Sequence, residues 1–305
     1  MVIYRIYLHI WFLKPYIKVC RAIYFGKGYD MKRKIVSDSS ANMYNFEGVD
    51  YTSVDMIIST DTKEYHDNEN LDVAQMVEEL SVYKGRSGTA CPGVGDWLEA
   101  FADADEVFCT TISGELSGSY NSALAAKEQY EETHPGRKVY VLDSRATGPT
   151  MKLLIEKFKE LISADKDYDT ICREIEDYKK HTCIIFSLES VRNLANNGRI
   201  NHAVAAIASM FGIRIVGDAP DGTLNPTDKV RGEKKAIACI YKNMKKSGYH
   251  GGRVLIDHCF NEGAAQTLKQ IITNEYADAE VIIANTTGLC SFYAEKGGLI
   301  IGFER

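Results

Sequence analysis

The chain has 305 residues, of which 45% are hydrophobic, and its formal net charge at pH 7 is −6. This length suffices for one large or two ordinary domains with a substantial core. The acidic balance, together with the lack of any dense cluster of lysine and arginine, excludes a nucleic-acid-binding surface.

The eight cysteines include no Cys-x-x-Cys pair and no short spacing to a histidine, so the sequence predicts no zinc site. Several of them lie in apolar stretches, where free cysteine behaves as a small hydrophobic residue. Because free thiols are typical of a reducing compartment, we expect a cytoplasmic protein.

Residues 1–30 are rich in aromatic and basic side chains, and Arg5, Lys14 and Arg21 interrupt the apolar runs. No uninterrupted apolar segment reaches membrane length, and no signal-peptide cleavage site is evident, so we expect no stable membrane span. Met31 reads as an ordinary cytoplasmic start. We interpret residues 1–30 as an upstream extension or a start-site artefact; a membrane-surface anchor is the alternative.

From residue 34 onward, short β-rich runs alternate with amphipathic stretches, which predicts βαβ units and a largely parallel sheet. Apolar residues recur at helical spacing in the stretches between them. Strands are expected at residues 34–37, 54–59, 106–111, 138–142, 182–186, 213–217, 253–257, 280–285 and 299–303. Helices are expected at residues 71–82, 119–130, 151–162, 168–180 and 231–246.

Asp221 and Gly222 form a two-residue turn signal between the runs 213–216 and 223–226, so antiparallel strands are expected in the second half. We therefore predict an α/β protein with a doubly wound, largely parallel N-terminal domain and a mixed α+β C-terminal domain. Their expected bounds are residues 31–150 and 151–305. The cleft between them is the expected ligand site.

The stretch 110–123, TTISGELSGSYNSA, joins an expected strand to an expected helix and is rich in hydroxyl groups and glycine. A helix N-terminus presents free N–H groups and partial positive charge, and Gly114 and Gly118 would let a ligand approach the backbone. An anion-binding turn is one interpretation. A plain helix cap by Ser117 or Ser119 is the other.

Three further turns of similar composition lie at residues 37–40, 87–93 and 143–148. In an open α/β sheet such turns gather at the carboxyl ends of the strands, where their neutral donors suit a carboxylate or a phosphate group. The sequence lacks both Gly-x-x-x-x-Gly-Lys-Ser/Thr and an early Gly-x-Gly-x-x-Gly, so we expect neither ATP nor NAD.

Three other residues are individually ambiguous. Arg199 follows the helix-closing sequence Asn196-Asn197-Gly198 and either reaches an anion in the cleft or is solvated at the surface. His258 follows a strand and is the best-placed candidate base, or else a locally bonded loop histidine. Arg231 is expected to begin a helix, where it forms a structural ion pair or contacts a ligand.

Taken together, these residues resemble the DegV family, whose members are similar to the fatty acid-binding subunits of bacterial fatty acid kinase. The resemblance runs from about residue 34 to residue 303, and its motifs occur in the family's order. They are VSDSS (36–40), TACPG (89–93), LSGSYNSA (116–123), Asp143-Ser144, Gly198-Arg199-Ile200, and Asp221-Gly222 followed by Lys229 and Arg231.

The resemblance implies a two-domain carrier that buries a long-chain fatty acid between its domains and has no catalytic residues or cofactor of its own. Thr89, Ser117 and the Gly118 amide would hold the carboxylate, with Arg199 beside it. Further candidates from the same turns and the C-terminal motif are Ser39, Ser119 and Cys290. A separate, dihydroxyacetone kinase-like protein would bind ATP and form the acyl phosphate for phospholipid synthesis.

The chain departs from the family pattern at two places. Ala90 replaces the usual serine beside Thr89, and the family's C-terminal Gly-x-His-x-Gly-Pro-Gly is absent, with Cys290 near the position of its histidine. Two alternatives therefore stay open. One is a hydrolase or transferase that uses Ser117 or Cys290 in the cleft, and the other is a sensor that binds a small molecule such as a lipid.

Overall fold

The computed structural model describes residues 31–208 and 212–305. The segment 1–30, interpreted above as an extension or a membrane-surface anchor, lies outside the described residues. Within the described ranges, no helix combines the length and the apolar character needed to cross a bilayer.

The first sheet contains four strands, all parallel. Ile35 and Phe108 pack on one face of it, against α5 (Pro149–Ser163) and α6 (Tyr168–Lys179), whereas Val36 and Val107 pack on the other, against α3 (Val94–Phe101) and α4 (Ser119–Thr133). Alternating apolar side chains thus cover both faces, which confirms the doubly wound layout. The strand order is β2 (Asp50–Val54), β1 (Arg33–Asp38), β6 (Glu106–Thr111), β7 (Lys138–Asp143).

The second sheet has six strands and is mixed, because only β11 (Val254–His258) and β12 (Val281–Asn285) pair in parallel. One face packs against α9 (Glu233–Lys246) and α10 (Glu262–Glu275), as Ile185 and Ile301 show. The mixed C-terminal sheet predicted from the sequence is confirmed. The strand order is β10 (Asn225–Arg231), β9 (Ile213–Asp218), β8 (Thr182–Leu188), β13 (Leu299–Glu304), β11 (Val254–His258), β12 (Val281–Asn285).

A small third sheet corrects the single strand expected at residues 54–59. Val54 ends the pairing of β2 with β1, and Ile57 begins an antiparallel pairing with β5 (Ser87–Ala90). Between them the Met56 N–H leaves the ladders and donates to Ser39 Oγ at 3.0 Å. The chain crosses from one sheet to another here, which a continuous apolar run does not reveal. The sheet contains β4 (Glu64–His66), β3 (Ile57–Thr60) and β5 (Ser87–Ala90).

The remaining helices connect these sheets. The expected helices are present, with the largest shift in α4, which ends at Thr133 rather than at residue 130. They include α2, which begins at Val73 because the Asp72 carboxylate accepts the N–H of Gln75 as an N-cap. The elements whose bounds have not yet been given are η1 (Ser39–Ala41), α2 (Val73–Val82), α7 (Arg192–Asn196), α8 (His202–Ala208) and α11 (Gly288–Ala294).

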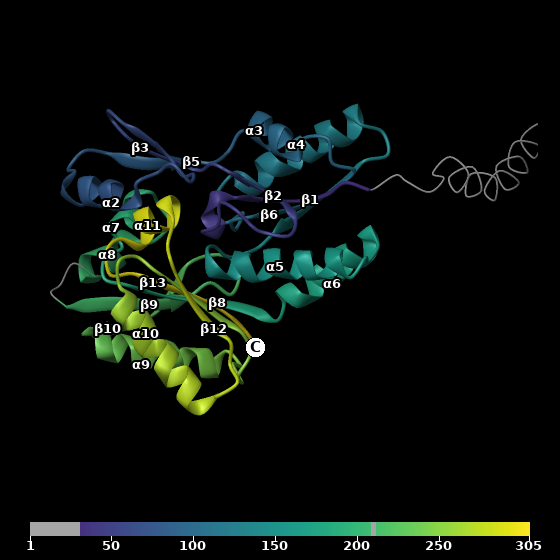
Figure 1. The fold of residues 1–305 in the computed structure, drawn as a ribbon. Helices are drawn as coiled ribbons and strands as arrows, with labels where there is room; N and C mark the ends of the chain where they lie inside the picture. Colours follow the sequence, from purple (N-terminus) through teal and green to yellow (C-terminus); the bar gives the residue numbers. More distant parts are fainter. Residues whose placement is uncertain (1–30, 209–211) are drawn as a thin grey trace, which may run out of the picture. The chain divides into compact units, whose positions relative to one another are not determined.

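The helix α5 lies between the first and second sheets and contacts strands of both (Figure 1). Its first turn meets Gly302 of β13 so closely that a Cβ atom there would lie 2.6 Å from the Thr150 nitrogen. Residues Arg33–Arg305 form one compact unit. The division into domains at residue 150 stays a prediction.

The expected hairpin is present, but its turn was predicted wrongly. β9 and β10 pair antiparallel with Asp218 opposite Asn225, so residues 219–224 form a loop rather than a two-residue turn at Asp221 and Gly222. The carbonyl of Gly222 accepts a hydrogen bond from Ser113 Oγ at 2.8 Å, so a contact with the first half of the chain shapes this loop. Arg231 ends β10 and does not begin α9, which starts at Glu233.

Candidate functional site

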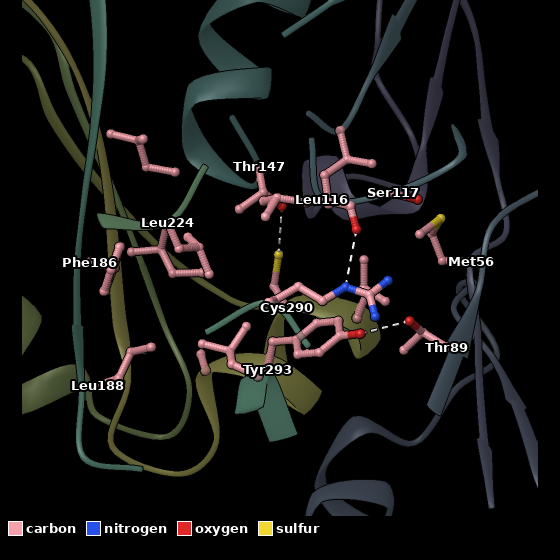
Figure 2. Close-up of a pocket in the computed structure, with 17 residues that line it drawn as sticks. Met56, Thr89, Leu116, Ser117, Thr147, Phe186, Leu188, Leu224, Cys290 and Tyr293 are labelled. Atoms are coloured by element: carbon pink, nitrogen blue, oxygen red, sulfur yellow. Dashed lines mark hydrogen bonds between the residues drawn. The ribbon is translucent and has the colours of Figure 1, made fainter. Parts of the chain in front are cut away.

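An apolar pocket of about 690 Å³, including its open mouth, lies among the carboxyl end of β6, the third sheet, β8 and α11. Ile184, Phe186 and Leu188 reach it from one face of β8, since alternate residues of a strand share a face. Figure 2 shows Phe186, Leu188 and Leu224 on one side and Thr89, Ser117 and Met56 on the other. The other lining residues are Ile112, Leu116, Thr147, Leu194, Arg199, Leu289, Cys290, Tyr293, Ala294 and Ile300.

The structure brings Thr89, Ser117 and Arg199 to this pocket from three segments that are distant in the sequence. They come from β5, from the loop before α4 and from the second residue after the C-cap of α7, which is Asn197. Two hydroxyl groups and one guanidinium are thus gathered beside an apolar cavity. Such a site can hold an anionic head group and bury an apolar tail.

The loop that carries Ser117 is held by the buried carboxylate of Asp38. This carboxylate accepts the N–H of Ile112 at 2.9 Å and Ser119 Oγ at 2.6 Å, and it also accepts bonds from Ser40. Burial raises the pKa of Asp38, and these hydrogen bonds oppose the shift. Asp38 therefore ties the end of β1 to both sides of the Ser117 turn.

The structure answers in part whether Ser117 or Ser119 caps the helix α4. The N-cap residue of α4 is Gly118, which makes no side-chain cap. Ser117 Oγ accepts the N–H of Ser119 at 3.3 Å, so Ser117 serves one free helix N–H and also faces the pocket. Gly118 is outside the lining, and a Cβ atom there would approach Cys91 Sγ to 3.3 Å.

The two other serine candidates are buried outside the pocket lining. Ser119 donates to Asp38, and Ser39 Oγ donates to Asp67 Oδ2 at 2.9 Å. Both hydroxyl groups therefore support the polypeptide around the site rather than face the cavity.

Arg199 is half-buried and held at the pocket by backbone carbonyl groups. Gly198 adopts φ 74°, and the Arg199 N–H closes the end of α7 on the carbonyl of Leu194 at 2.8 Å. Its Nε donates to the carbonyl of Leu116 at 3.1 Å, drawn as a dashed line in Figure 2. Of the two interpretations of Arg199, the structure supports the one in which it faces the cleft.

The helix α11 supplies Cys290 and Tyr293, one turn apart on the same helix face. The Tyr293 hydroxyl and Thr89 Oγ1 are 2.7 Å apart, and the Arg199 guanidinium carbon lies 5.9 Å from the Tyr293 ring centroid. The sequence analysis missed Tyr293. The available signal was its spacing of three residues from Cys290, which places both side chains on one face of a helix. Which face of the helix meets the pocket depends on the fold.

The pocket lining described here contains no histidine, aspartate or glutamate that could act as a base toward Ser117 or Cys290. Burial raises the pKa of the Cys290 thiol to about 12, so it is a poor nucleophile at neutral pH. His258 is buried outside the lining, and its Nδ1 accepts the N–H of Asn261 at 3.3 Å. The structure thus matches the locally bonded interpretation of His258 and weakens the hydrolase alternative.

Comparisons with known proteins agree with this architecture. The profile of the DegV family, described as an uncharacterised protein family, matches residues 32–305. A DegV domain-containing protein of Streptococcus gordonii is 38% identical over 279 residues, which is 90% of this chain and 99% of the relative.

Two solved structures are also similar. A DegV family protein of Eubacterium eligens, loaded with heptadecanoic acid, is 40% identical with a TM-score of 0.87 over 89% of this chain and 99% of the other. The fatty acid kinase (Fak) B3 protein of Streptococcus pneumoniae, loaded with linoleic acid, is 37% identical with a TM-score of 0.88 over 90% of this chain and 99% of the other.

Proposed function

The chain belongs to the DegV family, and on this basis we propose that its pocket binds a long-chain fatty acid. The carboxylate would lie at Thr89, Ser117 and Arg199, and the acyl chain along the apolar side formed by β8. The observation that carries this proposal is the cavity itself, in which Thr89 and Ser117 face the apolar side chains of Phe186, Leu188 and Leu224 (Figure 2).

Apolar burial and hydrogen bonding are expected to contribute very different free energies to binding in this pocket. Burial of about fifteen methylene groups at ~0.8 kcal/mol each contributes up to ~12 kcal/mol before ordering costs. A hydrogen bond to a charged group contributes only about 1.5–3 kcal/mol. The apolar wall therefore sets the affinity, while Thr89, Ser117 and Arg199 set the orientation of the carboxylate.

We further propose that the chain is a carrier and that a separate, dihydroxyacetone kinase-like protein phosphorylates the bound acid with ATP. Two observations support this: the sequence lacks a phosphate-binding loop, and the described pocket lining offers no base. The similar Streptococcus pneumoniae protein is itself described as a fatty acid kinase protein. The acyl phosphate would then serve phospholipid synthesis.

The first experiment is native and denaturing mass spectrometry of the full chain purified from cells. We expect a non-covalent ligand with the mass of a long-chain fatty acid. An empty pocket, or a covalent adduct on Ser117 or Cys290, would contradict the carrier proposal. The adduct would instead favour the hydrolase or transferase alternative.

A pair of variants tests the head-group site. Ser117→Ala should weaken the binding of heptadecanoic acid about tenfold, because one donor to the carboxylate is lost. The matched control is Ser81→Ala, since the Ser81 hydroxyl is exposed and donates to its own helix at Glu78. Equal affinities in the two variants would count against the assigned position of the carboxylate.

Incubation of the loaded chain with ATP and a dihydroxyacetone kinase-like protein tests whether the kinase phosphorylates the bound acid. Hydroxylamine trapping should detect the acyl phosphate only when the loaded chain, ATP and the kinase are all present. A chain that binds a fatty acid but yields no acyl phosphate would favour the sensor alternative.

A further inference from the structure

We propose that Tyr293 is a positioning residue that directs the hydroxyl proton of Thr89 toward the ligand's carboxylate. This inference rests on the proposed function and deepens it, because it names a residue that selects an ionised carboxylate over a neutral lipid head group. It concerns a side chain outside the motifs that the sequence analysis singled out.

The contact between the two hydroxyl groups carries the inference. The Tyr293 hydroxyl lies 2.7 Å from Thr89 Oγ1, although 204 residues separate them in the sequence. Both side chains line the pocket, and Figure 2 shows their hydrogen bond crossing from α11 to β5. The pair thus lies on the polar side of the cavity, where the carboxylate would be.

Either hydroxyl could donate in this contact, and we assign Tyr293 as the donor on chemical grounds. Each hydroxyl has one proton, and the phenol is the more acidic donor. Burial raises the pKa of Tyr293 above its usual value, so the phenol keeps its proton at neutral pH. When Tyr293 donates to Thr89, the proton of Thr89 is left to donate to a ligand, and each bond strengthens the other.

One contact involves the Tyr293 ring and another anchors the helix that carries it. The Arg199 guanidinium carbon lies 5.9 Å from the ring centroid, within the range of a cation–π contact. The helix that carries Tyr293 is held at its start by the buried carboxylate of Asp67, which accepts the N–H of Gly288 at 2.7 Å. Both contacts support the position of the phenol beside Thr89.

The arrangement favours a negatively charged hydrogen-bond acceptor over a neutral one. An ionised carboxylate accepts the proton of Thr89, and it also benefits from the nearby guanidinium of Arg199. A methyl ester has the same acyl chain but lacks the charge, so it gains less from a directed donor. The ratio of the two affinities therefore isolates the head-group contribution from the apolar contribution.

The test compares binding of heptadecanoic acid and methyl heptadecanoate to the delipidated full chain. In Tyr293→Phe we expect about tenfold weaker binding of the acid and a smaller loss for the ester, since the ring stays and only the hydroxyl is lost. Tyr140→Phe is the matched control, because the Tyr140 hydroxyl donates to Glu176 outside the pocket lining.

A double variant distinguishes positioning from direct contact. If Tyr293 acts through Thr89, then Thr89→Val combined with Tyr293→Phe binds the acid no more weakly than Thr89→Val alone. Additive losses would overturn the inference, because Tyr293 would then act on the ligand separately.

The remaining outcomes separate this inference from the proposed function. Unchanged acid binding in Tyr293→Phe, with weakened binding in Ser117→Ala, overturns the role of Tyr293 and leaves the fatty acid proposal intact. Failure of the unmodified chain to bind the acid overturns both. Thermal unfolding of each variant shows that an affinity change does not reflect loss of the fold.

Discussion

The carboxylate of Asp67 accepts the backbone N–H of Gly288 at 2.7 Å, across 221 residues of sequence. It also accepts the N–H of Leu289 at 2.9 Å, and these are the first two residues of α11. The N–H groups at a helix start have no partner within the helix, and Thr287 provides no side-chain cap. Asp67 therefore supplies, from a distant loop, the cap of the helix that carries Cys290.

Replacement of Asp67 by asparagine should lower the free energy of unfolding by about 2–3 kcal/mol, because an amide NH₂ would face backbone donors in a buried site. Urea denaturation provides the measurement. Asp165→Asn is the control, since the Asp165 side chain is 98% exposed and should shift stability by less than about 0.5 kcal/mol. Equal stabilities of the two variants would show that Asp67 does not hold α11.

Replacement of Gly302 by alanine should disrupt the packing of α5 on the second sheet. A Cβ atom at this position would lie 2.6 Å from the Thr150 nitrogen, and backbone atoms cannot turn aside as a side chain can. We expect a loss of at least about 2 kcal/mol in the free energy of unfolding.

Gly263 in α10 offers a matched control, because a Cβ atom there would have no neighbour within 4 Å. Gly263→Ala should be neutral or stabilise the chain by up to about 1 kcal/mol, since alanine favours the helix. If Gly302→Ala were equally harmless, the close approach of α5 to β13 would be wrong.

The stability of the chain should depend on pH through His258. Burial lowers the pKa of His258 below its usual 6.5, so the unfolded chain binds this proton first as the pH falls. The free energy of unfolding should therefore decrease as the pH falls below about 6.5, until the pKa of the folded state is passed. At neutral and higher pH, His258 does not reduce the free energy of unfolding.

Urea denaturation at pH 7.5 and pH 5.5 tests this dependence. His258→Gln should lose part of the pH dependence, whereas replacement of the exposed His250 by glutamine should retain it. An identical pH dependence in the unmodified chain and His258→Gln would show that the pKa of His258 is not shifted.

Cys290 should resist alkylation in the folded chain. Its pKa of about 12 leaves almost no thiolate at pH 8, and the thiolate is the form that reacts with iodoacetamide. Peptide mass spectrometry should find the half-exposed Cys91 labelled before Cys290, and both labelled after unfolding in urea. Rapid labelling of Cys290 in the folded, delipidated chain would instead revive the alternative in which it is a nucleophile.

Much of the fold was predictable because local patterns encode it. The alternation of strand and helix patterns identified the parallel first sheet, and the helix spacing located α4, α5, α6 and α9 to within a few residues. The third sheet was not predictable, since the break between Val54 and Ile57 is made by a tertiary hydrogen bond from Met56 to Ser39. The loop before β10 was misjudged for the same reason, through Gly222 and Ser113.

The residues of the candidate site were likewise only partly predictable from the sequence. The sequence by itself determined that hydroxyl-rich turns end the strands and indicated Ser117 and Arg199, and the family resemblance implied Thr89, before their convergence was known. Only the tertiary structure decided that Tyr293 meets Thr89 and that Asp67 caps α11. Turn and helix propensities act between near neighbours, whereas these contacts join residues more than two hundred positions apart and exist only once the sheets have packed.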